Sequence, residues 1–245
     1  MIEFDEQLRA SLASNLQAHD RRRLALEGRR HAAVALVVCD SDRDRGDDQE
    51  PVPPGAIDMS VVPGDARDGE GRALDGRMVG VTGGASFLLC RRATRMRRHA
   101  GQWALPGGRL DEGEEPLDAA LRELDEELGL SLAPENVIGW LDDYASRSGF
   151  VISPVVLWGG GELELDPDPT EVFAAYRIGL HALRDGEPRL IPIPESERPV
   201  LQLPLGNDLI HAPTAAMLLQ FRQVALLGCH GERVDHYEEP VFAWR

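Results

Sequence analysis

The stretch "GGRLDEGEEPLDAALRELDEELGL", Gly107 to Leu130, concentrates carboxylates between glycines in a chain that already carries a net charge of −16. Pro116 suits the first turn of a helix, and Gly129 suits its left-handed end. Between them, one face of the predicted helix carries Leu117, Leu121, Leu124 and Leu128. The spacing of these leucines predicts an amphipathic helix that buries one face.

Three carboxylates share another side of the same helix. At 100° per residue, Glu123, Glu126 and Glu127 form a stripe centred about 140° from the leucines. Like charges at this spacing repel each other, and partial burial raises their pKa values unless a cation intervenes. Mg²⁺ takes hard oxygen ligands and shares them with phosphates. The spacing therefore leaves two interpretations, a solvated acidic face or a cation site.

A longer pattern decides between them. The stretch fills every defined position of G-x5-E-x7-R-E-U-x-E-E-x-G-U, where U is a bulky aliphatic residue, with Gly108, Glu114, Arg122, Glu123, Leu124, Glu126, Glu127, Gly129 and Leu130. This pattern is the Nudix box, and the chain resembles the Nudix hydrolases. The resemblance implies an α+β fold, an α/β/α sandwich with a mixed central sheet. It also implies metal-dependent hydrolysis of the diphosphate linkage of a nucleoside diphosphate joined to another group, X.

The resemblance also implies roles for single residues. Arg122 would pair with Glu114 or a neighbouring carboxylate to hold the helix against the preceding loop, and Arg122 and Glu114 both count among the expected catalytic residues. The general base stays open between Glu126, Glu123 and Glu171, the last outside the box. The expected ligands of Mg²⁺ or Mn²⁺ are Glu123, Glu126, Glu127 and the carbonyl of Gly108.

Basic side chains gather just upstream, where five of the eight residues from Arg91 to Arg98 are Arg. Arg offers forked donors that match phosphate oxygens, so the segment predicts an anion-binding patch. It also resembles the coenzyme A pyrophosphatase signature L-L-T-x-R-[SA]-x3-R-x3-G-x3-F-P-G-G, with Cys90 in place of Thr and Leu105 in place of Phe. The matching residues are Leu88, Leu89, Arg92, Ala93, Arg97, Gly101, Pro106, Gly107 and Gly108.

This second resemblance implies coenzyme A or its thioesters as substrate, split into 3′,5′-ADP and (acyl-)4′-phosphopantetheine. His99 and Gln102 fit the L-R-x-H-x-G-Q segment of the same group. The expected substrate-binding residues are Arg92, Arg97, His99, Gln102 and Glu171. Alternatives are another nucleotide (ADP-ribose, NADH, a dinucleoside polyphosphate or an oxidised dNTP) or a non-catalytic nucleotide-sensing module.

The composition narrows the partners. Acidic residues outnumber basic ones 42 to 26, which argues against nonspecific binding to nucleic acid or to an anionic membrane. Cys39, Cys90 and Cys229 form neither a metal-binding spacing nor a disulfide framework, so the expected location is the cytoplasm. The expected partner is a small nucleotide.

We expect one domain over residues 1–245. Apolar residues at every fourth position predict an amphipathic helix within residues 1–30, ending in the basic run Arg21 to Arg23. Strands are predicted at "HAAVALVV", "ASFLLCRR", "VIGWLDDY", "SGFVISPVVLW" and "EVFAAYRIGL". The Asp-, Arg-, Gly- and Pro-rich composition of residues 40–77 predicts a mobile insertion between two strands.

Residues 184–245 are predicted to form a C-terminal extension. Its helix is expected at "PTAAMLLQFRQVALLG", with Pro213 near the first turn and Gly228 at the end. The apolar residues of this helix fit either the core or the surface of a homodimer. The segment "PVFAW" is expected to add a late strand.

Overall fold

The computed structural model describes residues 1–42, 44, 74–93 and 101–244. Most of the predicted insertion, residues 40–77, therefore lies outside the described residues, and so do the predicted site residues Arg97 and His99.

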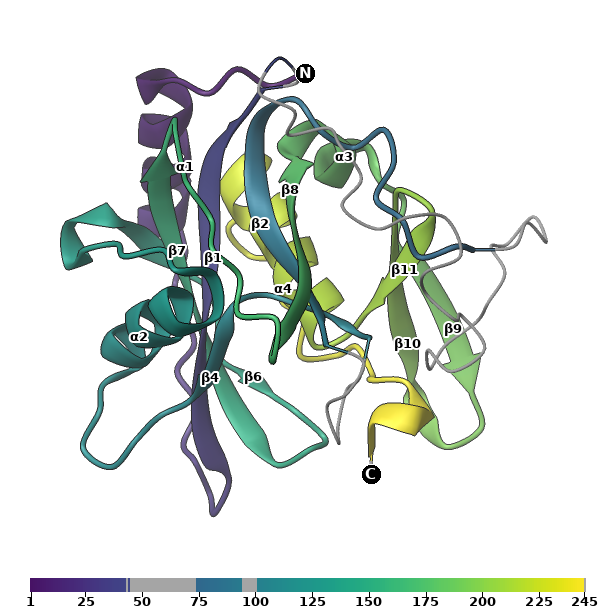
Figure 1. The fold of residues 1–245 in the computed structure, drawn as a ribbon. Coiled ribbons are helices and arrows are strands. Elements are labelled where there is room, and N and C mark those ends of the chain that lie inside the picture. Colours follow the sequence, from purple (N-terminus) through teal and green to yellow (C-terminus); the bar gives the residue numbers. More distant parts are fainter. Residues whose placement is uncertain (43, 45–73, 94–100, 245) are drawn as a thin grey trace.

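A mixed sheet of eight strands forms the centre of the fold (Figure 1). The strands are β1 (Arg30–Ser41), β2 (Gly84–Arg92), β3 (Trp103–Ala104), β4 (Gly107–Arg109), β5 (Val137–Trp140), β6 (Tyr144–Ala145), β7 (Phe150–Gly160) and β8 (Val172–Gly179). The main order is β3-β2-β1-β7-β5, while β4 pairs with β1, β6 with β7 and β8 with β2. β1 and β7 run parallel, and the other pairs are antiparallel. The predicted mixed central sheet is confirmed.

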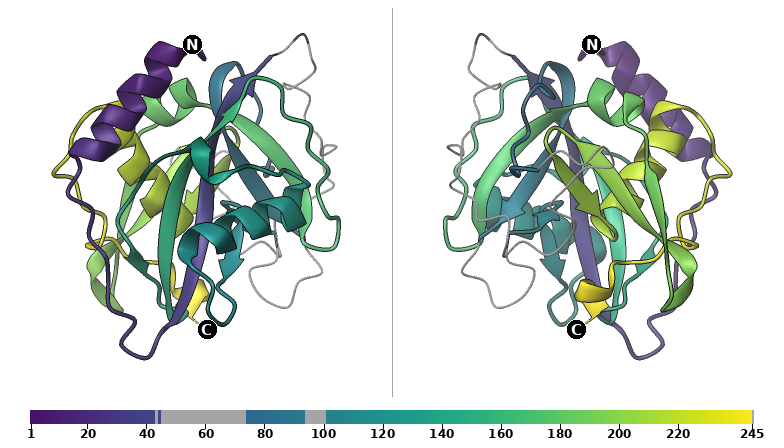
Figure 2. Two further views of the ribbon diagram at one scale, coloured as in Figure 1. Left: turned by 90° about the vertical axis from the view of Figure 1, so that its left-hand side faces the viewer. Right: turned by 90° about the vertical axis from the view of Figure 1, so that its right-hand side faces the viewer.

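Helices cover both faces of this sheet, and β1 shows why. Ala35 and Val37 point into a cluster with α2 (Pro116–Leu128), whereas Leu36 and Val38 point into the opposite cluster with α1 (Glu6–Ala18) and α4 (Thr214–Phe221). Successive strand residues face opposite sides, so a strand that is apolar throughout needs cover on both. Figure 2 shows α2 in front of the sheet in one view and behind it in the opposite one. The predicted α+β sandwich is confirmed.

The N-terminal helix α1 forms as predicted but ends earlier. The side chain of Asp5 caps it by accepting a hydrogen bond from the backbone N–H of Leu8 at 2.7 Å. Leu12 and Leu16 are buried against the core, and the helix ends at Ala18. The expectation that it runs into the Arg21–Arg23 run is wrong, because these residues lie outside any helix or strand. Arg21 instead pairs with Asp143 at 2.9 Å.

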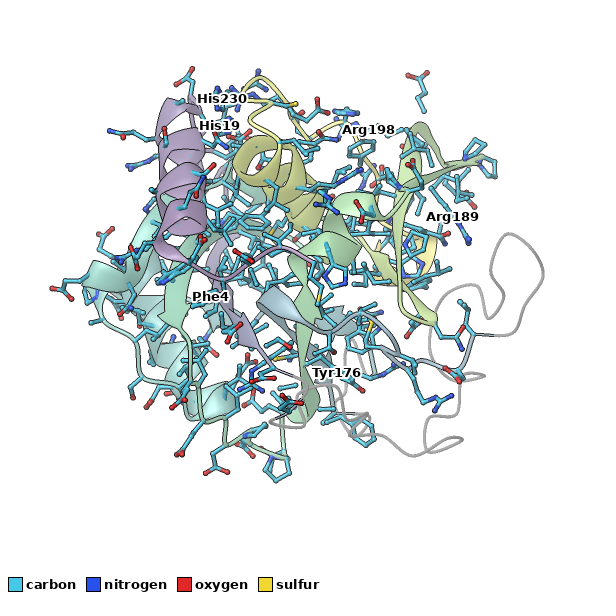
Figure 3. The ribbon with its side chains drawn as sticks, turned by 90° about the horizontal axis from the view of Figure 1, so that it is seen from above. Phe4, His19, Tyr176, Arg189, Arg198 and His230 are labelled. Atoms are coloured by element: carbon cyan, nitrogen blue, oxygen red, sulfur yellow. The ribbon has the colours of Figure 1, made fainter. Side chains whose placement is uncertain are left out.

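The end of α1 is joined to a loop near the C-terminus. His19 Nδ1 lies 2.6 Å from the carbonyl oxygen of His230, and the two residues lie side by side in Figure 3. His19 Nε2 contacts Asp142 at 2.9 Å, and Arg233 donates to the same carboxylate. These contacts tie segments from opposite ends of the chain together.

The C-terminal extension holds more structure than the sequence predicts. After the short helix α3 (Leu180–Asp185), a second sheet of order β11-β10-β9 stands beside the central one (Figure 1). Its strands are β9 (Arg189–Ile193), β10 (Ser196–Leu205) and β11 (Asp208–His211).

The predicted C-terminal helix is present as α4, followed by a π-helical turn, Arg222–Leu226. Every residue of α4 is buried, so this helix belongs to the core rather than to a dimer surface. The late strand expected at "PVFAW" is wrong: Val241–Trp244 forms a 3₁₀ helix, which begins after Pro240.

Candidate functional site

The site begins with two glycines in β4, at the edge of the sheet. Gly107 has φ +150°, and a Cβ there would lie 2.3 Å from the carbonyl oxygen of Ala33 and 2.6 Å from Cα of Val34. Backbone cannot move aside as a side chain can, so this position requires glycine. A Cβ on Gly108 would meet the carboxylate of Glu123 at 2.3 to 2.7 Å. The second glycine thus lets the α2 carboxylate lie directly against the loop.

Helix α2 places its three glutamates at graded depths. It starts at Pro116 and ends at Gly129, whose φ of 62° is left-handed, as predicted. The side chain of Glu127 is 5% exposed, that of Glu123 is 16% exposed, and that of Glu126 is 61% exposed. One edge of the carboxylate stripe therefore lies beneath the loop, and the other faces solvent.

Glu127 is the deepest of the three carboxylates. Its Oε2 accepts a hydrogen bond from the backbone N–H of Gly107 at 3.1 Å, and its Oε1 lies 3.8 Å from Arg92 Nη1. Burial raises the pKa of Glu127 to about 7, with the negative charges of Glu123 and Glu171 adding to the rise. A carboxylate held this way gains from any cation that approaches it.

Arg122 joins the helix to the loop before it. Its Nε and Nη2 donate to the two carboxylate oxygens of Glu114, at 2.9 and 3.0 Å, and Nη2 also donates to the carbonyl of Arg109 at 3.2 Å. Its Nη1 donates to Glu123 at 2.8 Å and to Glu126 at 3.0 Å. The hydrogen bonds from Arg122 lower the pKa of Glu114. The predicted pairing of Arg122 with Glu114 is present as a two-pronged contact.

Carboxylate oxygens are the ligand type that divalent cations prefer. Here two of these carboxylates, Glu123 and Glu126, are hydrogen-bonded to Arg122 instead. Burial raises the pKa of Glu123 although Arg122 opposes the rise, so the charged form lacks full compensation. Within the described residues, no three acidic, His or Cys side chains are gathered closely enough to hold a metal ion as they stand. The reason lies in the contacts: Arg122 Nη1 spans Glu123 and Glu126, while Glu127 bonds to the backbone of Gly107.

Three expected substrate-binding residues can be placed around this centre. Arg92 lies beside Glu127 and, with Gln102, lines a cavity next to the loop. Glu171 is exposed, and its charge acts on both Glu123 and Glu127. The adjacent Arg91 was expected to belong to the anion-binding patch, and this expectation is wrong. It is fully buried, donates to Asp208 at 3.0 Å and lies over the ring of Trp103, so its role is structural.

The cavity has a volume of about 300 Å³ and runs from the glycine loop to the C-terminal extension. Gly107 and Gly108 line one part of it, and Asp208, Glu239 and Phe242 line another. The sequence predicts no role for these C-terminal residues. They carry no motif, and more than ninety residues of chain separate Gly108 from Asp208, so only the folding of the chain brings them together.

The chain matches one known protein family over about half of its length. The NUDIX domain family model matches residues 75–201, just over half of the chain, and this range includes the glycine loop and α2. The chain belongs to the Nudix family. The predicted family resemblance and the predicted Nudix fold class are confirmed.

Named Nudix relatives match a shorter segment. The "Uncharacterized Nudix hydrolase NudL" of Yersinia pestis (strain Pestoides F) is 36% identical over 97 residues, which cover 39% of this chain and 49% of that protein. The protein of the same name from Yersinia pseudotuberculosis serotype O:1b (strain IP 31758) gives the same values. The matched segment thus spans about half the length of these curated relatives. Both relatives are named as Nudix hydrolases.

Solved Nudix structures are also similar to this chain. The Nudix hydrolase RenU from M. smegmatis has a TM-score of 0.44 at 20% identity, covering 82% of this chain and 88% of that one. The NUDIX domain of Shewanella oneidensis NrtR, solved with ADP ribose, has a TM-score of 0.42 at 14% identity, covering 82% of this chain and 90% of that one.

No described helix is both long and apolar enough to cross a membrane.

Proposed function

We propose that this Nudix protein hydrolyses the diphosphate linkage of a nucleoside diphosphate joined to a group X, with Mg²⁺ or Mn²⁺. The observation that carries the proposal is the buried carboxylate of Glu127, whose pKa burial raises to about 7, beside Glu123 and the glycine loop. Burying a carboxylate costs free energy unless a positive charge compensates it. A divalent cation that also contacts a diphosphate supplies that charge.

The ligands would be Glu123, Glu126, Glu127 and the carbonyl of Gly108. A divalent ion held there neutralises charge on the diphosphate and lowers the pKa of bound water. Arg122 would then keep α2 and the loop in register through Glu114, while its contacts to Glu123 and Glu126 give way to the ion.

Three glutamates are candidates for the general base. Glu126 is the most exposed of the box carboxylates, so it can meet a water molecule from solvent although its Oε2 accepts a hydrogen bond from Arg122. Glu123 is closer to the loop, and the charge of Glu171, the residue before β8, acts on Glu123. A base must lie within hydrogen-bond reach of the water it deprotonates, directly or through one further water. Substitution of each by Gln, with kcat measured across pH, separates them.

For the substrate we propose coenzyme A or its thioesters, split into 3′,5′-ADP and (acyl-)4′-phosphopantetheine. The support is the signature before the box, together with the placement of Arg92 and Gln102 in the cavity beside the loop. Arg97 and His99 complete the proposed substrate-binding set. ADP-ribose, NADH, a dinucleoside polyphosphate or an oxidised dNTP is the alternative. A non-catalytic module is disfavoured because every box carboxylate is present.

The test is a substrate panel with the full chain, run with Mg²⁺, with Mn²⁺ and with EDTA, and with products identified by mass spectrometry. We expect hydrolysis that EDTA abolishes, with the highest kcat/KM for coenzyme A or a thioester. An equal or higher kcat/KM for another nucleotide removes the substrate assignment and leaves the reaction class. Absence of hydrolysis of the whole panel removes both.

Glu127→Gln tests the proposed metal ligand directly. Loss of a charged ligand should lower kcat about 100-fold or more while the circular dichroism spectrum stays unchanged. Glu135→Gln, at an exposed glutamate after the box, is the matched control and should keep wild-type kcat. Metal-dependent turnover at the wild-type rate in Glu127→Gln would contradict the assignment.

We also propose a cytoplasmic location and leave a homodimer as the proposed alternative to a monomer. Cys39, Cys90 and Cys229 form no disulfide in the described part of the chain, which fits a reducing compartment. Because α4 is buried, a dimer would need another surface, such as β9 with its exposed Leu190 and Ile191. Light scattering coupled to size-exclusion chromatography measures the oligomeric state.

A further inference from the structure

The cavity beside the glycine loop is joined to the proposed reaction centre. Gly107, Gly108 and Arg92 line it at the end where Arg92 meets Glu127. A substrate whose diphosphate is held at the loop therefore has one of its halves next to this space. The volume of about 300 Å³ lies at the lower end of the range for small-molecule sites.

The lining away from the loop is apolar. The core sheet contributes Val34 and Ile152, and the C-terminal extension contributes Leu209, Met217 and Phe242. Phe242 remains exposed although it is a large apolar side chain, and its ring meets the ring of His211 edge-on, with centroids 5.4 Å apart. This wall offers aromatic and aliphatic contact area to a ligand.

The charged groups in the same lining are sorted by sign. Among the described lining residues, the Arg side chains are Arg92 and Arg109, and Arg109 stands in β4 beside the loop, whereas His211 stands in the C-terminal extension beside Phe242. The carboxylates of Asp208 and Glu239 belong to the C-terminal extension, and both are buried. Because Asp208 is already paired with the buried Arg91, a phosphate placed there would meet chiefly the negative charge of Glu239, with little solvent screening. An uncharged group with N–H or O–H donors meets acceptors there instead.

The C-terminal wall is fixed in position by a second set of contacts. The backbone N–H of Arg147 donates to Glu239 at 2.9 Å, and Arg147 Nε donates to Glu238 at 3.0 Å. The guanidinium of Arg147 lies 4.8 Å from the ring centroid of Trp244, whose Nε1 donates to the carbonyl of Glu239. The wall is thus tied to the turn that carries Ser148, another lining residue.

We propose that this cavity binds the phosphate-free part of the substrate's X group, an uncharged and largely apolar chain with hydrogen-bond donors, and that Phe242 determines specificity for it. The phosphorylated nucleoside would then lie outside the cavity. This inference rests on the proposed function, because the diphosphate must be held at the glycine loop.

The first arm of the test compares two substrates that share an ADP half, ADP-ribose and dephospho-coenzyme A, in the full chain with Mg²⁺. Phe242→Ala should raise KM for dephospho-coenzyme A about tenfold, because it removes apolar contact area. KM for ADP-ribose should change less than about twofold, and Phe242→Leu should restore most of the loss. Leu227→Ala, at an exposed apolar residue outside the cavity lining, is the control. An equal rise in KM for both substrates would overturn the inference.

The second arm needs no turnover, so it separates failure of the inference from failure of the proposed function. Binding of pantetheine and of AMP is measured by ligand-observed NMR. Pantetheine should bind the wild type and bind Phe242→Ala about tenfold more weakly, with AMP unchanged. If no substrate is hydrolysed but pantetheine behaves this way, the function fails and the cavity assignment stands. If pantetheine does not bind, or if AMP is the ligand that Phe242→Ala weakens, the cavity assignment falls.

Discussion

Single residues at the site have distinct structural roles, and the adjacent glycines Gly107 and Gly108 are an example. Gly107 faces the backbone of β1, whereas Gly108 faces the carboxylate of Glu123. An added methyl group meets rigid main chain at the first position and the end of a flexible side chain at the second. The same substitution should therefore affect folding at one glycine and catalysis at the other.

Gly107→Ala should lower the free energy of unfolding by about 2 to 4 kcal/mol, through strain at a left-handed φ and a backbone clash. Gly108→Ala should cost less than about 1 kcal/mol but lower kcat/KM about tenfold or more by displacing Glu123. Urea unfolding and steady-state kinetics measure the two effects. Equal losses of stability in both variants would contradict this division.

Glu239 provides a pH-dependent prediction. Burial raises its pKa to about 7 from an ordinary value of 4.5, so the folded chain binds a proton that the unfolded chain has released. Stability therefore falls as pH rises from about 4.5 to 7. Glu239→Gln keeps an oxygen acceptor for the N–H of Arg147 and removes this dependence.

The free energy of unfolding of Glu239→Gln, relative to wild type, should rise by about 1 to 3 kcal/mol between pH 5 and pH 8. Chemical denaturation at each pH measures it, and any constant cost of the new amide cancels in the difference. Glu135→Gln serves again as the exposed control. A difference that stays constant across this pH range would refute the raised pKa.

At the scale of elements, the loop–helix unit from β4 to α2 is held together by local contacts. Arg122 reaches the carbonyl of Arg109, the carboxylate of Glu114 and two glutamates of its own helix. Such a forked arrangement suits Arg and cannot be reproduced by the single ammonium group of Lys. The unit should loosen when the fork is lost.

Arg122→Ala and Arg122→Lys should both lower kcat/KM, by about 10- to 100-fold, with a loss of stability of about 1 to 2 kcal/mol. Arg9→Ala is the matched control, because Arg9 pairs with Glu6 on the exposed surface of α1 at 3.5 Å. Exposed pairs of this kind contribute little. Wild-type kinetics in Arg122→Lys would show that charge alone suffices.

Elements also differ in how far their sequence predicts them. β1, β2, β7, β8 and α2 follow from apolar runs or from helical spacing, and the structure has them. The sequence does not predict the three strands β9, β10 and β11. Their segment contains Pro192, Pro199 and Pro204, and proline cannot donate to a strand ladder. Pro192 lies in β9 at the edge of the three-stranded sheet, and Pro199 lies in the central strand β10 where its pairing with β9 shifts register between Ser196 and Val200.

At the scale of the whole molecule, the two ends of the chain meet at Asp142, between β5 and β6. This carboxylate accepts hydrogen bonds from the backbone N–H of Arg22, from Gln220 and from Arg233, and it contacts His19. Burial acts to raise the pKa of Asp142, but these contacts hold it below its ordinary value. The ionised carboxylate of Asp142 therefore holds the segment after α1 and the C-terminal segment together.

Asp142→Ala should lower the free energy of unfolding by about 3 to 5 kcal/mol, because it leaves Arg233 and His19 without their acceptor. Asp235→Ala, at an exposed Asp that pairs with Arg22 at 3.5 Å, should cost less than about 1 kcal/mol. Thermal and urea unfolding measure both variants. Similar small costs for the two would show that the Asp142 cluster adds little to stability.

The sequence by itself determined the family, the helix that carries the box carboxylates and the long strands β1, β2, β7 and β8 of the central sheet. These features depend on spacing within short segments, and such spacing survives in a linear sequence. Only the tertiary structure decided that Arg91 is buried, that Glu127 lies deeper than Glu126, and that Glu239 and Phe242 wall a cavity beside Gly108. Burial and long-range contact depend on how distant segments pack, and no local pattern encodes that packing.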